Sequence, residues 1–586
     1  MGQGRESIRR EGRLKPTGEK LRAYWRSAAR DDALAAFIVA ILLIPQSLAY
    51  ALLAGLPPQV GVYASLLPML AYAALGSSRV SSVGPVALTA LMTAQAIAGV
   101  AATGPVSATD AALVLAAETG LLLAAAALLR LDALASLLSV PVLQGFSTGA
   151  ALSIALTQLP VMLGSPARGF NAPEVLAAWW RSGQFGHALT AAFGIGALVL
   201  LIVARRHAAG LLRRWMSPDA AKLAARCAPL AIFAGAVALV AALQPTGPAT
   251  AHGVALVGTL PPMALPIALP PLAAALWWSL LPSAATIALV TFVSSLAVSE
   301  GLALQRGETV VARRELAGLA AANIVAACSA GMPVAGSFSR GAINAEAGAR
   351  TRMAGVWAAG FMALAMLLLA APLALLPKAV LAASIVLAVL GVAEWAAFAQ
   401  AWRYSRSEFA VMLGVALLTL FSSLAIALAA GVALSIALLL QRTARPHTAL
   451  IGRIPGTEHY RNVGRHRVEQ TPGVLALRID ESLLFTNARQ LPGVIAGYLA
   501  RQEADAGPVQ RVVLLMSPVN HIDFSGLEAL RALHATLAER AIRLDLSEVK
   551  GSVLDALRAG GWATWFRGRV FLSHHQGMLD EQGMAA

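Results

Sequence analysis

The chain has 586 residues, of which 58% are hydrophobic and only 13% are charged. That balance excludes an ordinary soluble globular protein and is typical of a chain that crosses a membrane. A formal net charge of +15 is also found in nucleic-acid-binding proteins, but here the basic residues lie between apolar segments. We interpret them as topogenic signals and expect no nucleic acid partner.

The N-terminal tail, residues 1–32, is strongly basic. Its first thirty residues contain nine Lys and Arg, which predicts a cytoplasmic location. The apolar stretch that follows is long enough to span a membrane, so we expect it to be retained rather than cleaved as a signal peptide.

Hydropathy predicts fourteen membrane-spanning helices within residues 33–441, since a helix of about 20 apolar residues crosses the hydrocarbon layer. The segments are 33–54, 61–75, 85–101, 110–129, 140–163, 188–204, 228–243, 281–304, 315–331, 338–350, 353–376, 379–393, 409–425 and 427–441. Arginines follow the sixth and eighth segments, whereas the connection 244–280 has no charged residue. This pattern and the even number predict a multi-pass inner-membrane protein with both termini in the cytoplasm.

Two of these segments, 85–101 and 338–350, are short and follow a stretch that breaks a helix. Residues 81–85 read Ser-Ser-Val-Gly-Pro, and residues 331–336 read Gly-Met-Pro-Val-Ala-Gly. Each segment is the third span of its seven-span half. Interrupted helices at matching positions indicate an inverted repeat with a binding site near the middle of the bilayer. We therefore expect a polytopic all-α membrane protein of 14 spans, arranged as a 7+7 inverted repeat.

The two breaks also predict the chemistry of the site. Half-helices that face each other each offer free N–H groups and about half a positive charge. Ser337 and Ser339 add hydroxyls, and Arg340 adds a full positive charge. These donors predict an anion site. The alternative is that the serines only cap the helix and that Arg340 pairs with an acid or extends to the interface.

After residue 445 the charge density rises, which indicates a soluble domain. Strands are expected at 474–479, 511–516 and about 542–546, with a helix after Asp523 that repeats leucines at helical spacing. We expect a linker at 442–472, a compact α/β domain at 473–575 and a tail at 576–586. No histidine or cysteine spacing matches a metal site, and no cofactor is implied.

Several motifs resemble the SulP (sulfate permease) family, and together they cover about 500 residues, which is more specific than any one short motif. Residues 44–51 read Ile-Pro-Gln-Ser-Leu-Ala-Tyr-Ala and residues 336–340 read Gly-Ser-Phe-Ser-Arg. Further matches lie at 54–58, 61–65, 75–79, 83–87, 145–150 and 347–351. The segments 484–488 and 522–527 resemble the STAS domain that is usual in that family.

The resemblance implies a core domain that holds the anion between the third and tenth spans and moves against a gate domain. It implies a small inorganic or organic anion (sulfate, bicarbonate, chloride or dicarboxylate) as the substrate and a homodimer in membrane lipid. The coupling ion stays open, with H⁺ and Na⁺ as the candidates. Carried over position by position, the lining residues would be Gln46, Tyr50, Val86, Ala87, Ser337, Phe338, Ser339 and Arg340.

One position departs from the family pattern. Many members have a carboxylate in the eighth span, where this chain has Ser294. Glu118, at the centre of the fourth span, is the candidate to take over proton coupling, because a carboxyl there is costly unless it is protonated, paired or hydrated. The alternative is that Glu118 stays neutral and hydrogen-bonds a neighbouring helix.

By the same resemblance, Ser525 matches the position where related bacterial STAS proteins carry a phosphorylatable residue, which makes it a candidate for regulation. A simpler hypothesis is that Ser525 and Glu528 form a capping box at the start of a helix.

These observations predict a secondary active transporter or exchanger of a small anion that works by alternating access. An uncoupled anion channel on the same scaffold and a membrane sensor that signals through the STAS domain stay open as alternatives. A membrane-bound enzyme is not expected, because no HExxH motif or Ser-His pair is evident.

Overall fold

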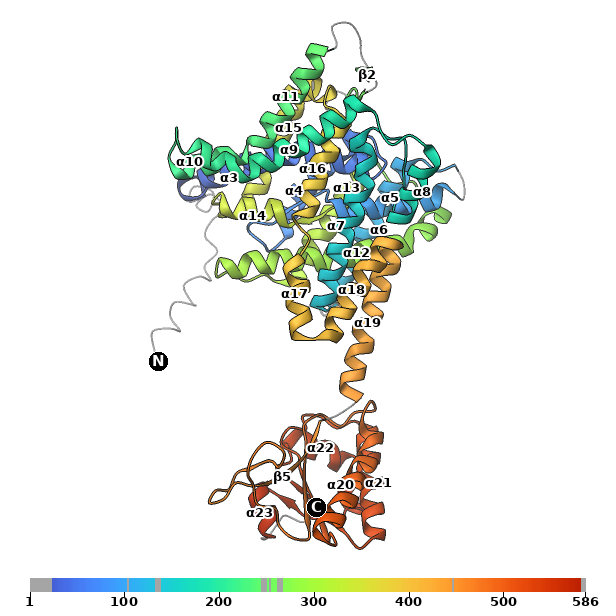
Figure 1. Cartoon of the computed structure of the whole chain (residues 1–586), viewed down its shortest axis with the longest axis vertical. Coiled ribbons are helices and arrows are strands. Elements are labelled where there is room, and N and C mark those ends of the chain that lie inside the picture. Colours follow the sequence, from blue (N-terminus) through green and yellow to red (C-terminus); the bar gives the residue numbers. More distant parts are fainter. Residues whose placement is uncertain are drawn as a thin grey trace. The chain divides into compact units, whose positions relative to one another are not determined.

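The computed structural model describes residues 24–102, 105–131, 139–243, 250–251, 254–260, 267–444 and 447–580. The chain divides into a helical unit, Met1–Leu434, and a smaller unit, Ser435–Ala586, and each is described by itself (Figure 1). Most of the expected basic tail, part of the 244–280 connection and the last six residues of the expected C-terminal tail lie outside the described residues.

Each of the fourteen apolar segments corresponds to a helix, with ends that differ most in α9 and α12. The helices are α3 Ala29–Leu53, α4 Pro58–Leu75, α5 Ala87–Ala101, α6 Ala108–Leu128, α7 Val140–Leu163, α9 Ala188–Leu212, α11 Ala228–Leu243, α12 Ala274–Gln305, α13 Ala312–Cys328, α14 Phe338–Glu346, α15 Met353–Ala374, α16 Lys378–Leu390, α18 Arg406–Phe421 and α19 Leu424–Ala444. Within the described ranges, nine helices are long and apolar enough to cross a membrane, and α5 and α11 are shorter apolar helices.

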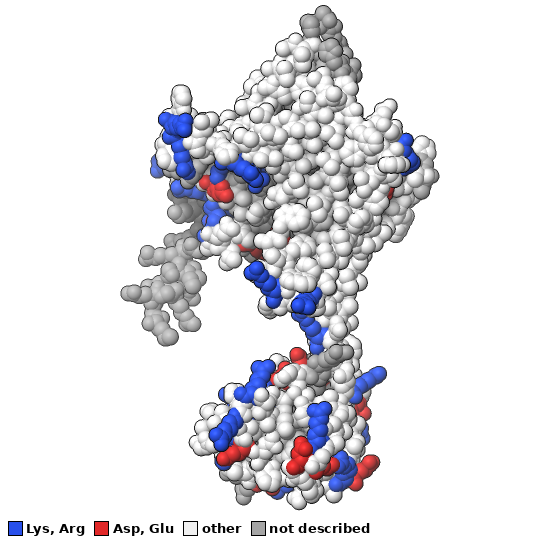
Figure 2. Space-filling view, in the orientation of Figure 1, with Lys and Arg blue, Asp and Glu red and all other residues white. Residues whose placement is uncertain are grey.

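Helices from the two halves of the chain interleave in two groups. In the first, which we name the core group, α3 to α6 pack with α12 to α15, so that early and late helices lie side by side (Figure 1). In the second, the gate group, α16 packs against α7 and α9, and α18 packs against α7. On the face in Figure 2, charged side chains are sparse over the helical unit, as expected for a surface in contact with lipid.

Close backbone contact joins α7 to α18. A Cβ atom added at Gly145 would lie 2.3 Å from the carbonyl oxygen of Met412, and one added at Gly149 would lie 2.5 Å from that of Ala416. Small residues four apart let two membrane helices approach in this way. The gate group therefore contains a pair of helices whose separation leaves no room for a side chain at these positions.

In the part of the helical unit that the structure describes, three short helices lie outside the predicted set: α8 Ala172–Ser182, α10 Pro218–Arg226 and α17 Trp395–Tyr404. Two of them occupy matching places, because α8 follows the fifth apolar helix of the first half and α17 follows the fifth of the second. Both contain tryptophan and arginine, residues that are enriched where helices meet the membrane interface. The placement of α8 and α17 agrees with the predicted 7+7 inverted repeat.

The smaller unit is built on a six-stranded sheet in the order β10-β9-β8-β7-β5-β6. Strands β7 to β10 are parallel, β5 is antiparallel to β7, and β6 is antiparallel to β5. The elements are β5 Thr448–Arg453, β6 Tyr460–Asn462, β7 Val474–Ile479, α20 Leu491–Ala506, β8 Arg511–Leu515, α21 Phe524–Glu539, β9 Arg543–Ser547, α22 Gly551–Ala559, β10 Val570–Phe571 and α23 His574–Leu579, with 3-10 turns at Ala488–Gln490 and Trp562–Thr564.

The three predicted strands are confirmed as β7, β8 and β9. The sheet begins earlier than the sequence predicts, because β5 and β6 lie within the range 442–472 that we expected to be a linker. Unlike the helical unit, this unit shows Lys, Arg, Asp and Glu intermixed over the face in Figure 2.

The capping box predicted at Ser525 is wrong. Asp523 is the N-cap residue of α21, and its side chain accepts a hydrogen bond from the Gly526 backbone N–H at 2.8 Å. The other carboxylate oxygen of Asp523 accepts from the Phe485 N–H at 2.7 Å, which holds the cap in place. Ser525 is thus the second residue of the helix, half-buried, and too far along to cap it.

Candidate functional site

The two broken stretches meet in the core group. Strand β1, Ser82–Gly84, pairs antiparallel with β4, Ala335–Ser337, and Val83 lies opposite Gly336. Helix α14 begins directly after β4, and two residues separate the end of β1 from α5, so they leave the pair in opposite directions with both N-termini toward it. Two positive helix ends therefore meet at one place.

Side chains from two other helices satisfy this non-helical backbone. The amide of Asn323, on α13, donates to the Val334 carbonyl oxygen at 3.0 Å and accepts from the Val334 N–H at 2.9 Å. The hydroxyl of Ser295, on α12, accepts from the Gly336 N–H at 2.8 Å. Such partners are what extended backbone inside a membrane protein requires. Neither residue was predicted from the sequence to belong to the site.

Arg340 lies at the centre of this arrangement. Its side chain is buried in the first turn of α14, and Nη1 donates to the Pro85 carbonyl oxygen, just before α5, at 2.9 Å. In the described ranges Nε and Nη2 have no hydrogen-bond partner, and no acidic side chain pairs with the guanidinium. Among the described residues, the structure therefore does not support the alternative that Arg340 pairs with an acid. A buried cation with spare donors suits an anionic ligand.

The serines of α14 lie beside this cation. Ser337 is the N-cap residue and its hydroxyl accepts from the Arg340 backbone N–H at 3.5 Å. The hydroxyls of Ser337 and Ser339 are 3.3 Å apart. Phe338, between them, is half exposed. The capping role predicted as an alternative for Ser337 is therefore present, and it places two hydroxyls next to Arg340.

The remaining predicted lining residues come from α3 and α5. Gln46 and Tyr50 are one helical turn apart on α3, which packs against both α5 and α14. The Gln46 side-chain oxygen is buried and has no hydrogen-bond partner in the described part of the chain. Val86 is the N-cap residue of α5 and Ala87 its first residue, so they contribute the backbone of that helix end.

Ser294 and its neighbour Ser295 take different positions on α12. The Ser294 hydroxyl donates to the Val290 carbonyl oxygen of its own helix at 2.6 Å, whereas Ser295 is buried and contacts the second break. A pair of adjacent serines in a spanning helix signals that one of them faces the bundle, but only the three-dimensional contacts show which one.

Glu118 is buried on α6, which packs against α5, α12 and α13. Its Oε2 atom has no hydrogen-bond partner among the described residues. The structure gives it no hydrogen bond or ion pair with Arg340 or with the other predicted lining residues.

A second buried carboxylate, Glu315 on α13, was not singled out by the sequence analysis. It accepts hydrogen bonds from Tyr72 Oη at 2.6 Å, from the Ser77 N–H and hydroxyl at 2.9 and 2.6 Å, from the Ser78 N–H at 2.8 Å, and from Ser299 Oγ at 3.5 Å. The carboxylate is satisfied without a cation. It fixes the loop that leads into β1, and so it positions the strand pair.

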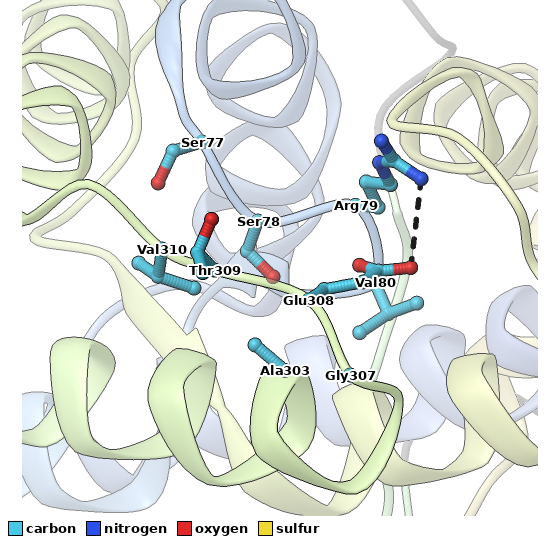
Figure 3. A pocket seen from close by; sticks show the side chains of 9 residues that line it. All are labelled: Ser77, Ser78, Arg79, Val80, Ala303, Gly307, Glu308, Thr309 and Val310. Atoms are coloured by element: carbon cyan, nitrogen blue, oxygen red, sulfur yellow. Dashed lines mark ion pairs between the residues drawn. The ribbon is translucent and has the colours of Figure 1, made fainter. Parts of the chain in front are cut away.

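A pocket of about 330 Å³ opens beside this loop (Figure 3). Its lining residues are Ser77, Ser78, Arg79, Val80, Ala303, Gly307, Glu308, Thr309 and Val310. Arg79 and Glu308 approach each other across it at 3.6 Å, as the dashed line in Figure 3 marks. None of the predicted lining residues borders this pocket, although the Asn344 amide of α14 donates to the Val80 carbonyl oxygen at 3.0 Å. Over the residues that the structure describes, no cluster of three His, Cys, Asp or Glu could hold a metal ion.

Comparisons with known proteins agree on one family. A model of the sulfate permease family matches residues 30–415, and a STAS domain model matches residues 465–577. A probable sulfate transporter of Mycobacterium tuberculosis is 34% identical over 547 residues, which cover 92% of this chain and 93% of that protein. The chloroplastic sulfate transporter 4.1 of Arabidopsis thaliana is 31% identical over 558 residues, covering 93% and 79%.

Solved structures share the fold at lower identity. Murine Solute Carrier 26 family member A9, an anion transporter, matches with a TM-score of 0.81 and 21% identity over 97% of this chain and 95% of that one. The transmembrane domain of a cyanobacterium bicarbonate transporter matches with a TM-score of 0.57 and 18% identity over 70% and 97%. The chain is thus a multi-pass membrane protein that belongs to the sulfate permease family and carries a STAS domain after its helical domain.

Proposed function

We propose that the protein is a secondary active transporter or exchanger that carries a small anion across the inner membrane by alternating access. The observation that supports this most directly is Arg340, a buried cation at the place where the N-termini of α5 and α14 meet, with two nitrogen atoms that have no hydrogen-bond partner among the described residues. The family relationship and the names of the relatives support transport of an anion in general.

In this proposal the anion binds between the two helix ends. Arg340 supplies charge through Nε and Nη2, the hydroxyls of Ser337 and Ser339 supply further donors, and Val86 and Ala87 offer the backbone of α5. Each helix end adds about half a positive charge without a second buried cation. Gln46, Tyr50, Phe338 and Ser294 would form the walls.

Sulfate is the first substrate to test, because relatives that cover most of this chain are named sulfate transporters. Bicarbonate, chloride and dicarboxylates are the other candidates, since helix dipoles and hydroxyls distinguish anions poorly. H⁺ and Na⁺ are the candidate coupling ions, and Glu118 is the candidate proton carrier.

The test is uptake of labelled anions into proteoliposomes under a proton gradient, a sodium gradient and no gradient. A carrier saturates and shows counterflow with unlabelled anion, whereas a channel gives neither. The variant Arg340→Ala should raise the KM for the transported anion about 10- to 100-fold, which corresponds to the loss of a charge-assisted hydrogen bond. Arg403→Ala removes an exposed arginine of α17 and serves as the matched control.

An unchanged KM in correctly inserted Arg340→Ala protein would remove this residue from the site. Flux that shows neither saturation nor counterflow would contradict a carrier mechanism and favour an anion channel.

A further inference from the structure

The STAS domain contains a pocket of about 270 Å³ that the transport proposal does not use. Its lining residues are His447, Arg461, Asn462, Arg465, His466, Arg478 and Asp480. Strand pairing explains why they gather, since β5 pairs with both β6 and β7. His447 precedes β5 and Asp480 follows β7, and the Asp480 N–H donates to the His447 carbonyl oxygen at 2.9 Å.

The charges that line this pocket do not balance. Three arginines stand against one aspartate, which leaves two positive charges before either histidine is protonated. The aspartate is fully engaged: Arg478 donates to both of its oxygens, and His447 Nδ1 lies 2.7 Å from Oδ2. Partial burial would raise the pKa of Asp480, but the hydrogen bonds from Arg478 and His447 outweigh it and hold that pKa below its usual value.

The excess charge belongs to Arg461 and Arg465. In the described ranges neither side chain pairs with a carboxylate, and the one side-chain hydrogen bond of Arg461 is from Nη1 to the Tyr460 carbonyl oxygen at 3.0 Å. Arg453, on the neighbouring strand, does have an acidic partner, with Nη2 3.1 Å from Glu469 Oε2. The two unpaired guanidinium groups line a hollow, so both can reach one ligand.

The shape and composition of the pocket select the kind of ligand. Its volume corresponds to roughly nine waters at about 30 Å³ each, enough for a small hydrated anion. The described residues that line it include no Phe, Tyr or Trp, so they offer no platform on which a base could stack. Arginine forks match the paired oxygens of sulfate and phosphate.

We propose that this pocket is a second anion site, separate from the transport site, and that it binds a tetrahedral inorganic oxyanion, sulfate or phosphate, through Arg461 and Arg465 with His447 and His466 beside them. His447 stands three residues after Ala444, the last residue of α19. The pocket is therefore close in sequence to the end of α19. With sulfate the domain would sense the transported ion, and with phosphate it would sense a different solute.

The experiment is hydrogen-deuterium exchange on the purified full-length protein, with sodium phosphate or sodium sulfate titrated at constant ionic strength. Peptides that cover residues 447–480 report this pocket by themselves, so an anion at the transport site does not interfere. We expect saturable protection of these peptides by at least one of the two anions. Arg461→Ala combined with Arg465→Ala should weaken binding, which raises the half-saturating anion concentration at least tenfold.

Arg467→Ala is the matched control, because Arg467 is an exposed arginine of the same turn that does not line the pocket. It should leave the half-saturating concentration within about twofold of wild type, which is within about 0.4 kcal/mol. The proposal is overturned if neither anion protects residues 447–480. It is also overturned if the double variant binds the anion as tightly as wild type does, or if Arg467→Ala weakens anion binding as much as the double variant does. If the double variant fails to fold, as unliganded exchange of β7 and β8 would show, Arg465→Gln alone is measured against the same criteria.

Discussion

Three carboxylates are buried in the described part of the helical unit, and their surroundings differ. Asp32 accepts hydrogen bonds from the N–H groups of Arg350 and Thr351 and from the Thr351 hydroxyl. Glu315 accepts five hydrogen bonds, as described above. Donors of this kind stabilise the ionised form. Glu118 has an oxygen with no such donor, so it is the carboxyl for which a proton is the simplest partner.

This contrast makes Glu118→Gln the informative change for proton coupling. If Glu118 exchanges a proton during transport, the variant should lose the pH dependence of uptake between pH 5 and 8 and its response to an imposed proton gradient. The measurement is uptake by both proteins in proteoliposomes, with Glu300→Gln, which changes an exposed carboxylate of α12, as the control. An unchanged pH profile would assign Glu118 to helix packing and would favour exchange or sodium coupling.

His574, in the STAS domain, predicts a pH dependence of stability. Burial lowers its pKa to about 4, with Arg511 and His575 adding to the effect, while its Nδ1 hydrogen-bonds Ser547 at 2.7 Å. An unfolded histidine has a pKa near 6.5, so between about pH 6.5 and 4 the unfolded chain binds more protons. The free energy of unfolding of the STAS domain should therefore fall as the pH falls through that window, by about 1.4 kcal/mol per pH unit.

The measurement is the free energy of unfolding of residues 447–580 in the full chain, monitored by hydrogen exchange between pH 4 and 7. His574→Gln should flatten the slope, whereas His521→Gln, at an exposed position, should keep it. Equal slopes in all three proteins would mean that another group controls the response.

At the scale of the helices, the contact of α7 with α18 gives a direct test of packing. Gly149→Ala would place a Cβ atom 2.5 Å from the Ala416 carbonyl oxygen, so the helices must separate, and overpacking of this kind costs about 1 to 3 kcal/mol. Gly414→Ala, on α18, meets nothing within 4 Å and is the control. We expect a lower melting temperature in detergent for the first variant only. Equal melting temperatures would show that the two helices separate without cost.

The apolar helices could be predicted from the sequence because lipid demands long apolar runs. The breaks could be predicted because residues 81–85 and 331–336 group glycine with proline, and both residues destabilise a helix. The short helices α8 and α17 could not, since they are too short and too mixed in polarity to register as spans. Strands β5 and β6 were missed because their turn-rich surroundings are typical of a linker.

Within the candidate site, residue types were easier to predict than partners. Arg340 is unusual by itself, since a charge in an apolar segment demands an explanation. Asn323, Ser295 and Glu315 are ordinary polar residues until the fold brings residues 77–78, 334 and 336 to them. Their roles depend on contacts between segments that are far apart in the chain.

For the molecule as a whole, the division into two units predicts that the anion site survives without the STAS domain. The residues proposed to bind the transported anion all lie in the helical unit, and the smaller unit has its own apolar core. Deletion of residues 447–586 should therefore leave an inserted protein that binds anion, with an altered transport rate or assembly. Loss of anion binding by a monodisperse truncated protein would place part of the site in the STAS domain.

The guanidinium of Arg340 also has an electrical consequence. Arginine stays charged at any working pH, so a divalent anion bound beside it moves with a combined charge of −1 instead of −2. Moving one elementary charge across the full membrane field takes about 2.3 kcal/mol per 100 mV, so in the proposed cycle this residue would halve the electrical work of the step that carries a bound divalent anion inward against an inside-negative potential. The empty site would return with its own charge of +1, so the net electrical work of a whole cycle would be unchanged. In Arg340→Lys vesicles the voltage dependence of sulfate flux should stay as in wild type, whereas in Arg340→Ala vesicles it should become steeper. If the transported anion is divalent, a cation carried permanently in the site would thus act as a built-in counter-ion, which lowers the voltage barrier of the loaded step.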